Sequence, residues 1–393
     1  MVANISPCVN YIGVDDTDID LFESQYVVPR GISYNSYVIT DDKIAVMDTV
    51  DRRKIDEWMA NLDVALDGKE PDYLIVQHME PDHAAGISAF ALKYPNTLIV
   101  ATAKALQMMP QFFEKIILKE RTKAVKEGDT LPLGKHTLHF IQAPMVHWPE
   151  VMVTYEDNKR ILFSADAFGT FGALCYNEPW RTEARRYFIN IVGKYGAQVQ
   201  TLLRKASKLD ITTICPLHGP VLKDNLEFHI GLYNTWSSYE PETDGTLVAH
   251  ASIHGHTAAA ALAMADILRK KTSTEVVVID LCRDDMSVAV EKAFQFSRLV
   301  LAASSYDAGL FTPMHDFLHR LQIKNFQNRR IGIIENGSWA PSAGRVMKSM
   351  LEGMKKIRLA EPLVTIKSAM KAADVAQMEL LADNLLNAET VAY

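Results

Sequence analysis

One short segment limits the fold of this chain more than any other. The apolar run YLIVQH (73–78) is typical of a buried strand, and two imidazoles and two carboxylates follow within six positions, at His78, Glu80, Asp82 and His83. Burying such groups is costly unless they are paired or bind a metal. A satisfied surface cluster is the alternative, but so many potential ligands at one strand end favour a site.

Length and composition predict two domains in an ordinary globular protein. The chain has 393 residues, 48% of them hydrophobic and 23% charged. Single hydrophobic cores stop growing near ~250–300 residues, so a second core is expected. The polar stretch SSYEPETDGT (237–246) is the natural linker. We therefore expect domains over residues 1–243 and 244–393.

Charge and targeting signals exclude several classes of protein. The net charge is -7 without a long run of like charges, which favours neither nucleic acid nor a membrane surface as partner. No apolar stretch reaches the ~18 residues needed to span a bilayer. The N-terminus lacks a basic start followed by an apolar core, so no signal peptide is expected. These features predict a cytoplasmic protein.

The cysteines indicate neither disulfides nor a thiolate metal site. The chain has four, Cys8, Cys175, Cys215 and Cys282, and no two of them form a CxxC pair. This spacing excludes a thiolate zinc site and a rubredoxin-type iron centre. Scattered, unpaired cysteines fit a reducing cytosol.

The first ~240 residues predict a layered α/β domain. A helix is expected over 104–119, where apolar residues recur at helical spacing. Short polar turns make the strand pairs 36–40/43–50 and 151–157/160–166 look antiparallel. The expected strands are 36–40, 43–50, 73–78, 97–103, 137–144, 151–157 and 160–166.

The pattern changes after Gly245. Five short, β-branched runs are separated by helical segments, as in a parallel, doubly wound sheet. The expected strands are 246–250, 275–280, 298–304, 331–335 and 363–367.

Three loops follow strands of this second sheet and predict a ligand site at its carboxyl edge. ASIHGHT (251–257) leads from the first strand into an Ala-rich helix, which presents backbone N–H groups to a phosphate. SSYDAGLF (304–311) and NGSWAPSAG (336–344) each place an aromatic residue among small ones. Two alternatives are a purely structural Gly/Ser turn and aromatic residues that cap an apolar edge. The convergence of three such loops on one edge favours a ligand site over both.

These loops resemble those of the flavodoxin fold, and the resemblance covers 246–393. It implies one non-covalent FMN, with ASIHGHT at the phosphate and the two other loops beside the isoalloxazine. His254 and His256 are unusual in such a loop, and either could donate to the phosphate. The implied FMN contacts are Ser252, Ile253, His254, Gly255, His256, Thr257, Ser304, Ser305, Tyr306, Asp307, Gly309, Leu310, Gly337, Ser338, Trp339 and Ala340.

Further ligand types follow later strands of the first half. His147 lies in MVHWPE, Asp166 ends RILFSAD, and His218 ends TTICPLH. Each lone histidine would more often be a satisfied polar residue than a ligand. Together with the first cluster they make four histidines and three carboxylates. Seven ligands are too many for one ion, so two metals bridged by a carboxylate are expected.

This pattern resembles the metallo-β-lactamase fold, an αββα sandwich whose hydrolases carry H-x-H-x-D-H and then His, Asp and His. Glu80 stands where those zinc enzymes have the middle histidine. A carboxylate in place of an imidazole makes the site harder and favours iron over zinc.

H-x-E-x-D-H in such a domain, followed by a flavodoxin-like domain, resembles the flavodiiron proteins (A-type flavoproteins) over nearly the whole chain. The matching segments are 29–39, 145–150, 163–169 and 216–220. The resemblance implies two non-haem irons with a bridging oxygen species. One iron would take His78, Glu80 and His147, the other Asp82, His83 and His218, and Asp166 would bridge both.

The resemblance also implies an oxidoreductase that reduces O2 to water, NO to N2O, or both. FMN would pass electrons from an external donor such as rubredoxin, and a head-to-tail homodimer or a dimer of dimers would bring FMN and irons together. A binuclear hydrolase fused to a flavodoxin-like module and a plain FMN electron carrier are the alternatives. Many relatives have a histidine near Gln25 and Tyr26, which this chain lacks, so the roles of these residues and of Tyr195 stay open.

Overall fold

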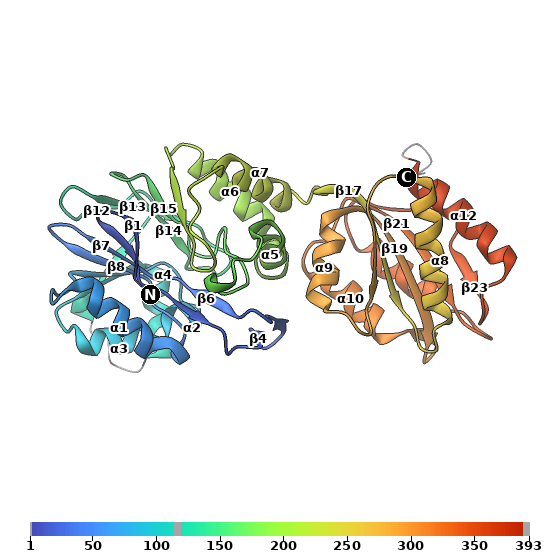
Figure 1. The fold of residues 1–393 in the computed structure, drawn as a ribbon, viewed down its shortest axis with the longest axis horizontal. Helices are drawn as coiled ribbons and strands as arrows, with labels where there is room; N and C mark the ends of the chain where they lie inside the picture. The colour runs from blue at the N-terminus through green and yellow to red at the C-terminus, as the bar shows by residue number, and fades with distance from the viewer. Residues whose placement is uncertain (1, 114–118, 388–393) are drawn as a thin grey trace. The chain divides into compact units, whose positions relative to one another are not determined.

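The computed structural model describes residues 2–113 and 119–387. The chain forms two compact units, Met1–Asn234 and Thr235–Tyr393. The boundary expected between residues 243 and 244 lies shortly after this division, at the start of strand β17 (Thr243–Ala251). Each unit has its own sheets and core, so each is described by itself (Figure 1).

The first sheet of the N-terminal unit has the strand order β1-β2-β7-β8-β9-β10-β11. Strands β8, β9, β10 and β11 are parallel to one another, whereas β1, β2 and β7 add antiparallel pairs at one side. The strands span Ala3–Ser6 (β1), Val9–Tyr11 (β2), Tyr37–Thr40 (β7), Ile44–Met47 (β8), Tyr73–Val76 (β9), Leu98–Thr102 (β10) and Thr122–Val125 (β11).

The second sheet has the order β12-β13-β14-β15-β16 and is antiparallel except for β15 and β16. Its strands span Thr130–Pro132 (β12), Thr137–Gln142 (β13), Met152–Glu156 (β14), Ile161–Phe163 (β15) and Thr213–Cys215 (β16). One buried apolar cluster contains residues of both sheets, such as Met47 and Ile75 from the first and Phe140 and Phe163 from the second. The two sheets therefore pack face to face, as in other sandwiches.

Helices cover the outer faces of this sandwich (Figure 1). Helices α1 (Ile55–Leu66) and α3 (Ile87–Lys93) lie along the first sheet, and α6 (Gly196–Ala206) lies along the second. Helix α4 (Ala103–Phe112) covers the start of the helix expected over 104–119, of which 114–118 lie outside the described residues. The αββα arrangement expected from the sequence is thus confirmed.

The seven strands expected in the first half are present, with trimmed ends. The hairpins β7/β8 and β14/β15 are antiparallel as expected. Sequence patterns missed strands β1, β2, β11 and β12 and two small two-stranded sheets. These sheets pair Val14–Asp16 (β3) with Ile32–Tyr34 (β6) and Leu21–Phe22 (β4) with Tyr26–Val27 (β5).

The C-terminal unit contains a parallel sheet of the order β18-β17-β19-β21-β22, in which β23 also pairs with β21. Its strands span Val276–Asp280 (β18), Phe296–Tyr306 (β19), Arg329–Asn336 (β21), Ile357–Leu359 (β22) and Val364–Ile366 (β23), besides β17. A short strand, Gly309–Leu310 (β20), adds an antiparallel pair to β19. The predicted doubly wound sheet is confirmed, although its last position is shared by β22 and β23.

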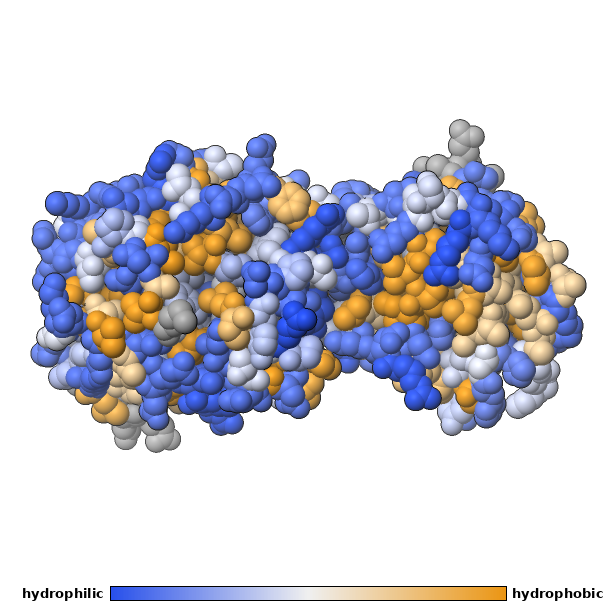
Figure 2. Space-filling view, viewed as in Figure 1, coloured by the Kyte–Doolittle hydropathy of each residue, from blue (hydrophilic) through white to orange (hydrophobic). Residues whose placement is uncertain are grey.

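Helices lie on both faces of this sheet (Figure 1). Helices α8 (His256–Lys271) and α12 (Ala372–Leu386) share one core with the sheet, whereas α9 (Met286–Gln295) and α10 (Thr312–Ile323) lie on the other face. Polar residues cover most of the surface that Figure 2 shows, and apolar residues form separate patches. Among the described residues, no helix combines the length and the apolar character needed to cross a membrane.

Candidate metal centre and flavin cavity

The seven predicted metal ligands all follow the ends of strands in the N-terminal unit. His78 and Glu80 lie in the loop after β9, and Asp82 and His83 lie in the short helix α2 (Pro81–Ala84). The other three come from the second sheet: His147 between β13 and β14, Asp166 after β15, and His218 after β16. Both sheets of the sandwich are therefore needed to assemble the cluster.

A proline and several hydrogen bonds determine the path of the first ligand loop. Pro81 is the first residue of α2, a position where its missing N–H costs nothing. The buried carboxylate of Asp48 accepts hydrogen bonds from Gln77 N at 2.7 Å and from Gln77 Nε2 at 2.9 Å. Thr49 Oγ1 donates to the carbonyl of His83 at 2.6 Å. These bonds hold both ends of the 78–83 segment to the end of β8.

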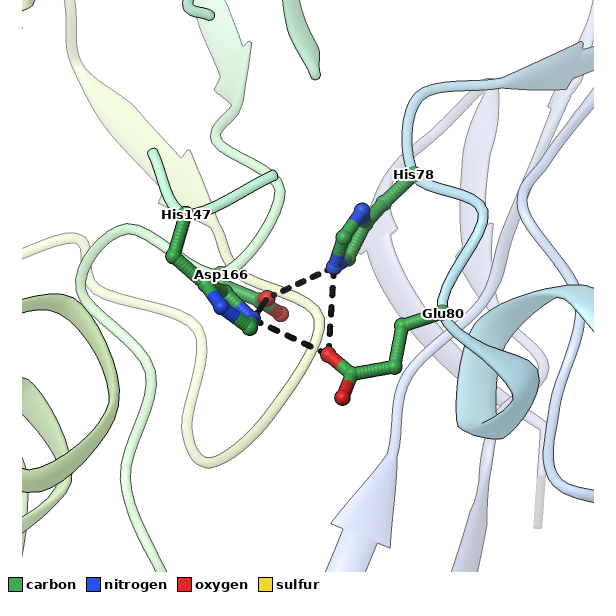
Figure 3. Close-up of side chains that lie close together, drawn as sticks. All are labelled: His78, Glu80, His147 and Asp166. Atoms are coloured by element: carbon green, nitrogen blue, oxygen red, sulfur yellow. Dashed lines mark hydrogen bonds and ion pairs between the residues drawn. The ribbon is translucent and has the colours of Figure 1, made fainter. Parts of the chain in front are cut away.

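One group of ligands consists of His78, Glu80, His147 and Asp166 (Figure 3). Glu80 Oε2 lies 3.2 Å from His78 Nε2 and 2.9 Å from His147 Nε2. Asp166 Oδ2 lies 3.2 Å from His78 Nε2 and 3.1 Å from His147 Nε2. Four donor atoms from three loops thus point toward one place.

A second group consists of Asp82, His83 and His218. Asp82 Oδ2 lies 3.2 Å from the Nε2 atom of each histidine, and the two Nε2 atoms are 3.0 Å apart. The other oxygen of Asp166, Oδ1, lies 3.3 Å from His83 Nε2 and 3.9 Å from His218 Nε2. Asp166 therefore presents one oxygen to each group, which is the position expected of a bridging carboxylate.

Hydrogen bonds on the far side of two imidazoles fix their orientation. His78 Nδ1 donates to Glu150 Oε1 at 2.8 Å, and the same oxygen accepts from Met79 N at 2.9 Å. His218 Nδ1 donates to the carbonyl of Ser33 at 2.7 Å. With Nδ1 carrying the proton, Nε2 is left to face the cluster, as metal-ligating histidines require.

The spacing of the donor atoms fits two metal ions. Ligands with bonds of 2.0–2.2 Å at tetrahedral or octahedral angles lie roughly 3.0–3.4 Å from one another. Most separations in both groups are 2.9–3.3 Å. The buried oxygens of Asp82 and Asp166 have no hydrogen-bond partner among the described residues, although ring nitrogens lie nearby. Unpaired buried carboxylates surrounded by imidazole nitrogens are stabilised when cations lie between them.

The pKa values of the cluster indicate the same need for positive charge. Burial alone would lower the pKa of His78, but Asp166, Glu150 and Glu80 hold it well above the ordinary value. Burial would also lower the pKa of His147, but the carboxylates of Asp166 and Glu80 raise it to about 9. Burial would raise the pKa of Asp166, yet His78 and its neighbours keep it well below the usual range. Without metal, protons supply the charge that these carboxylates attract.

Aromatic side chains enclose the histidines. The Tyr187 ring lies 5.4 Å from that of His218, as does the Phe22 ring at the end of β4. The Trp148 ring lies perpendicular to that of His78 at 5.4 Å. Sequence reasoning singled out Tyr195 instead of Tyr187, because nothing local shows which tyrosine faces His218. These rings make the surroundings of the cluster largely apolar.

The residues whose roles stayed open lie at identifiable places. Tyr195 is half-buried in a 3-10 turn, Gly193–Tyr195, with the Lys194 ammonium 5.8 Å from its ring centre. Tyr26 is buried and donates to the carbonyl of Asn190 at 3.1 Å. Gln25 is exposed in the β4–β5 turn and donates to Glu23 Oε2 at 3.2 Å. No histidine of the described chain occupies this turn.

The C-terminal unit contains a cavity of about 660 Å³ at the carboxyl ends of β17, β19 and β21. This volume is in the range of small-molecule sites, and the edge of a doubly wound sheet is where such ligands bind. Trp339 is 92% exposed at the cavity and is free to cover a flat ring. The cavity combines small polar residues, aromatic residues and the N-terminus of α8, so its residues fit FMN.

Thirteen of the sixteen predicted flavin contacts line this cavity, and three, Gly255, Gly309 and Leu310, do not. Gly255 lies within the phosphate loop, and Leu310 is buried in β20. Six further residues line the cavity without being among the predicted contacts. Four of them lie within the loops 304–311 and 336–344, one lies in the helix Ala343–Glu352, and one follows β23. They are Ala308, Asn336, Pro341, Ser342, Arg345 and Ser368.

Replacing Glu150 by glutamine should weaken metal binding, because it removes the charge that orients His78. Loss of such an outer partner typically lowers metal affinity about 10- to 100-fold. Competition of Fe²⁺ between the protein and a chelator measures the change. Glu156→Gln is the matched control, since Glu156 is equally buried and accepts from His136 at 2.8 Å, remote from the ligands. Equal affinities in both variants would contradict this role of Glu150.

Metal binding should release protons, and the affinity should rise with pH. The raised pKa values of His78 and His147 mean that both rings are protonated near neutral pH in the metal-free protein, whereas a metal needs the neutral rings. Adding Fe²⁺ anaerobically to metal-free protein in weak buffer at pH 7.5 should therefore acidify the solution, by roughly one proton for each of these histidines. A titration without proton release would show that the rings are already neutral.

The chain is similar to known proteins in sequence and in fold. Residues 32–219 match the family described as ODP family beta lactamase. The chain is 28% identical to the anaerobic nitric oxide reductase flavorubredoxin of Aliivibrio salmonicida over 86% of this chain and 70% of that protein. The structure is similar to that of the rubredoxin oxygen:oxidoreductase of Desulfovibrio gigas, with a TM-score of 0.91 and 23% identity over 98% of each chain. It is also similar to the flavodiiron protein of Giardia intestinalis, with a TM-score of 0.89 and 23% identity over 98% of this chain and 96% of that one. Residues 32–219 are thus similar to this beta-lactamase family, and the chain shares the fold of these two structures.

Proposed function

We propose that this protein is a flavodiiron oxidoreductase that reduces O2 to water, NO to N2O, or both. The first reaction consumes four electrons and four protons for each O2, and the second consumes two of each for two NO. The observation that carries the proposal is the pair of ligand groups joined by Asp166, which includes three carboxylates. The names of the flavorubredoxin and of the rubredoxin oxygen:oxidoreductase describe the same two reactions.

The ligand set favours iron over zinc. His78, Glu80 and His147 would hold one ion, Asp82, His83 and His218 would hold the other, and Asp166 would offer one carboxylate oxygen to each. Glu80 contributes a hard oxygen ligand where zinc hydrolases of this fold have an imidazole, and hard oxygen ligands suit iron. Hydrolysis is therefore not proposed for this centre.

When bound, ferrous irons would reduce the gas and FMN would deliver electrons to them one at a time. The protein's own residues orient the ligands and keep water away from them. Glu150 and Ser33 orient imidazoles through their Nδ1 atoms. The rings of Phe22, Trp148 and Tyr187 exclude bulk water from the histidines.

FMN would lie in the cavity at the edge of the C-terminal sheet. The 252–257 loop would hold its phosphate, and Tyr306 and Trp339 would pack beside the isoalloxazine. An electron donor such as rubredoxin would supply electrons to the FMN. The protein would act in the cytoplasm as a head-to-tail homodimer or as a dimer of dimers, with FMN of one chain serving the irons of the other.

Mixed dimers of two inactive variants test this arrangement. Ser252→Glu places a carboxylate where the phosphate would bind and should abolish FMN binding, whereas Asp166→Ala should abolish iron binding. The two variants are co-expressed with different tags, and the mixed dimer is purified over both tags. In this dimer, FMN bound by the Asp166→Ala chain can serve the irons of the Ser252→Glu chain, so one of the two electron routes is intact. It should show about half the gas-reductase activity of the parent dimer.

Each variant alone should be inactive while keeping its other cofactor, which flavin absorbance and iron analysis check. A mixed dimer without activity would show that electrons do not cross between chains. Failure to recover any mixed dimer would contradict the dimer, whereas a parent protein that binds iron and FMN but reduces neither gas would contradict the proposed reaction.

A further inference from the structure

The phosphate loop of the flavin cavity contains two histidines in place of permanently charged residues. His254 and His256 both line the cavity and are exposed, on either side of Gly255. Gly255 has a φ of +88° and precedes the first residue of α8, so the loop turns sharply into a helix of 16 residues. The sequence ASIHGHT offers no lysine or arginine to a phosphate.

Two hydroxyl groups of this loop already have hydrogen-bond partners in the protein. Gly255 N donates to Ser252 Oγ at 3.1 Å, and the hydroxyls of Thr257 and Ser304 lie 2.8 Å apart. The N-terminus of α8 supplies a partial positive charge of the kind that binds anions. Within residues 251–257, only the two imidazoles can carry full positive charge.

We propose that His254 and His256 form a protonatable clamp for the phosphate of FMN, so that the protein holds this cofactor more tightly when the two imidazoles are charged. The inference rests on the proposed FMN site and adds regulation to it: cofactor retention falls as the solution becomes alkaline.

Other ionisable groups lie at or near the same cavity. Asp307 and Tyr306 follow β19, and Arg345 projects from α11 (Ala343–Glu352). Cys282, after β18, has its sulfur 4.0 Å from the carbonyl of Ser252. Asp307 adds negative charge to the lining of the cavity, and Arg345 adds positive charge. Arg345 stays charged at all relevant pH values, so it cannot produce a response near neutrality.

The sign of the response separates the clamp from the titration of FMN itself. The phosphate loses its second proton near pH 6, and the added negative charge alone would strengthen binding at a helix N-terminus as pH rises. Loss of charge on the imidazoles acts in the opposite direction. Binding of FMN that weakens with rising pH, and that loses this dependence when both histidines are replaced, therefore indicates a positive charge lost from the imidazoles.

The test titrates the full-length, flavin-free protein with FMN and with riboflavin between pH 6 and pH 8.5, following the quenching of flavin fluorescence. The Kd for FMN of the parent protein should rise over this range, by about threefold to tenfold, as expected for exposed ion pairs. Riboflavin has no phosphate, so its Kd should stay unchanged. In the double variant His254→Asn/His256→Asn, the Kd for FMN should stay level or fall as pH rises.

Two controls complete the design. His319→Asn changes an exposed histidine of α10 outside the cavity lining and should keep the parent response. His254→Lys/His256→Lys carries permanent charge and should bind FMN tightly at pH 8.5. A double asparagine variant that keeps the parent pH dependence for FMN would overturn the clamp alone. A parent protein that binds neither flavin would overturn the proposed FMN site as well.

Discussion

The buried carboxylate of Asp166 is the constraint on which the metal centre depends. Its side chain is inaccessible to solvent, and its two oxygens face imidazoles of different ligand groups. A buried anion without aligned hydrogen-bond donors is stable only where positive charge surrounds it. In the metal-free protein, protonated histidines supply that charge. When metal cations bind, these protons would be released and the cations would supply the charge instead. One side chain thus couples the two groups electrostatically.

The sandwich fold brings Asp166 and its partners together from distant parts of the chain. The 78–83 segment follows the first sheet, whereas His147, Asp166 and His218 follow strands of the second. The packing of the two sheets around a common core therefore determines the distances within the cluster. In the other unit, the cavity likewise depends on loops that follow different strands of one parallel sheet. In both units, function is built at strand ends on a rigid scaffold.

The sequence predicted much of this because the ligands follow apolar runs of unmistakable strand character. YLIVQH and RILFSAD place His78 and Asp166 at strand ends without knowledge of the tertiary structure. Partners that depend on pairing across the fold could not be predicted. Glu150 meets His78 across 72 positions and Ser33 meets His218 across 185. Tyr187 packs on His218 from a helix whose sequence, WRTEARRY, shows only an amphipathic surface pattern.

The central claim is that one carboxylate joins two metal positions, and an anaerobic titration of the metal-free protein with ⁵⁷Fe²⁺ tests it most directly. Mössbauer spectra after oxidation report both the iron content and the magnetic coupling between ions. The geometry predicts two irons for each chain that behave as one antiferromagnetically coupled pair in the parent protein. Binding of a single iron, or of two irons that remain magnetically independent, would contradict the account.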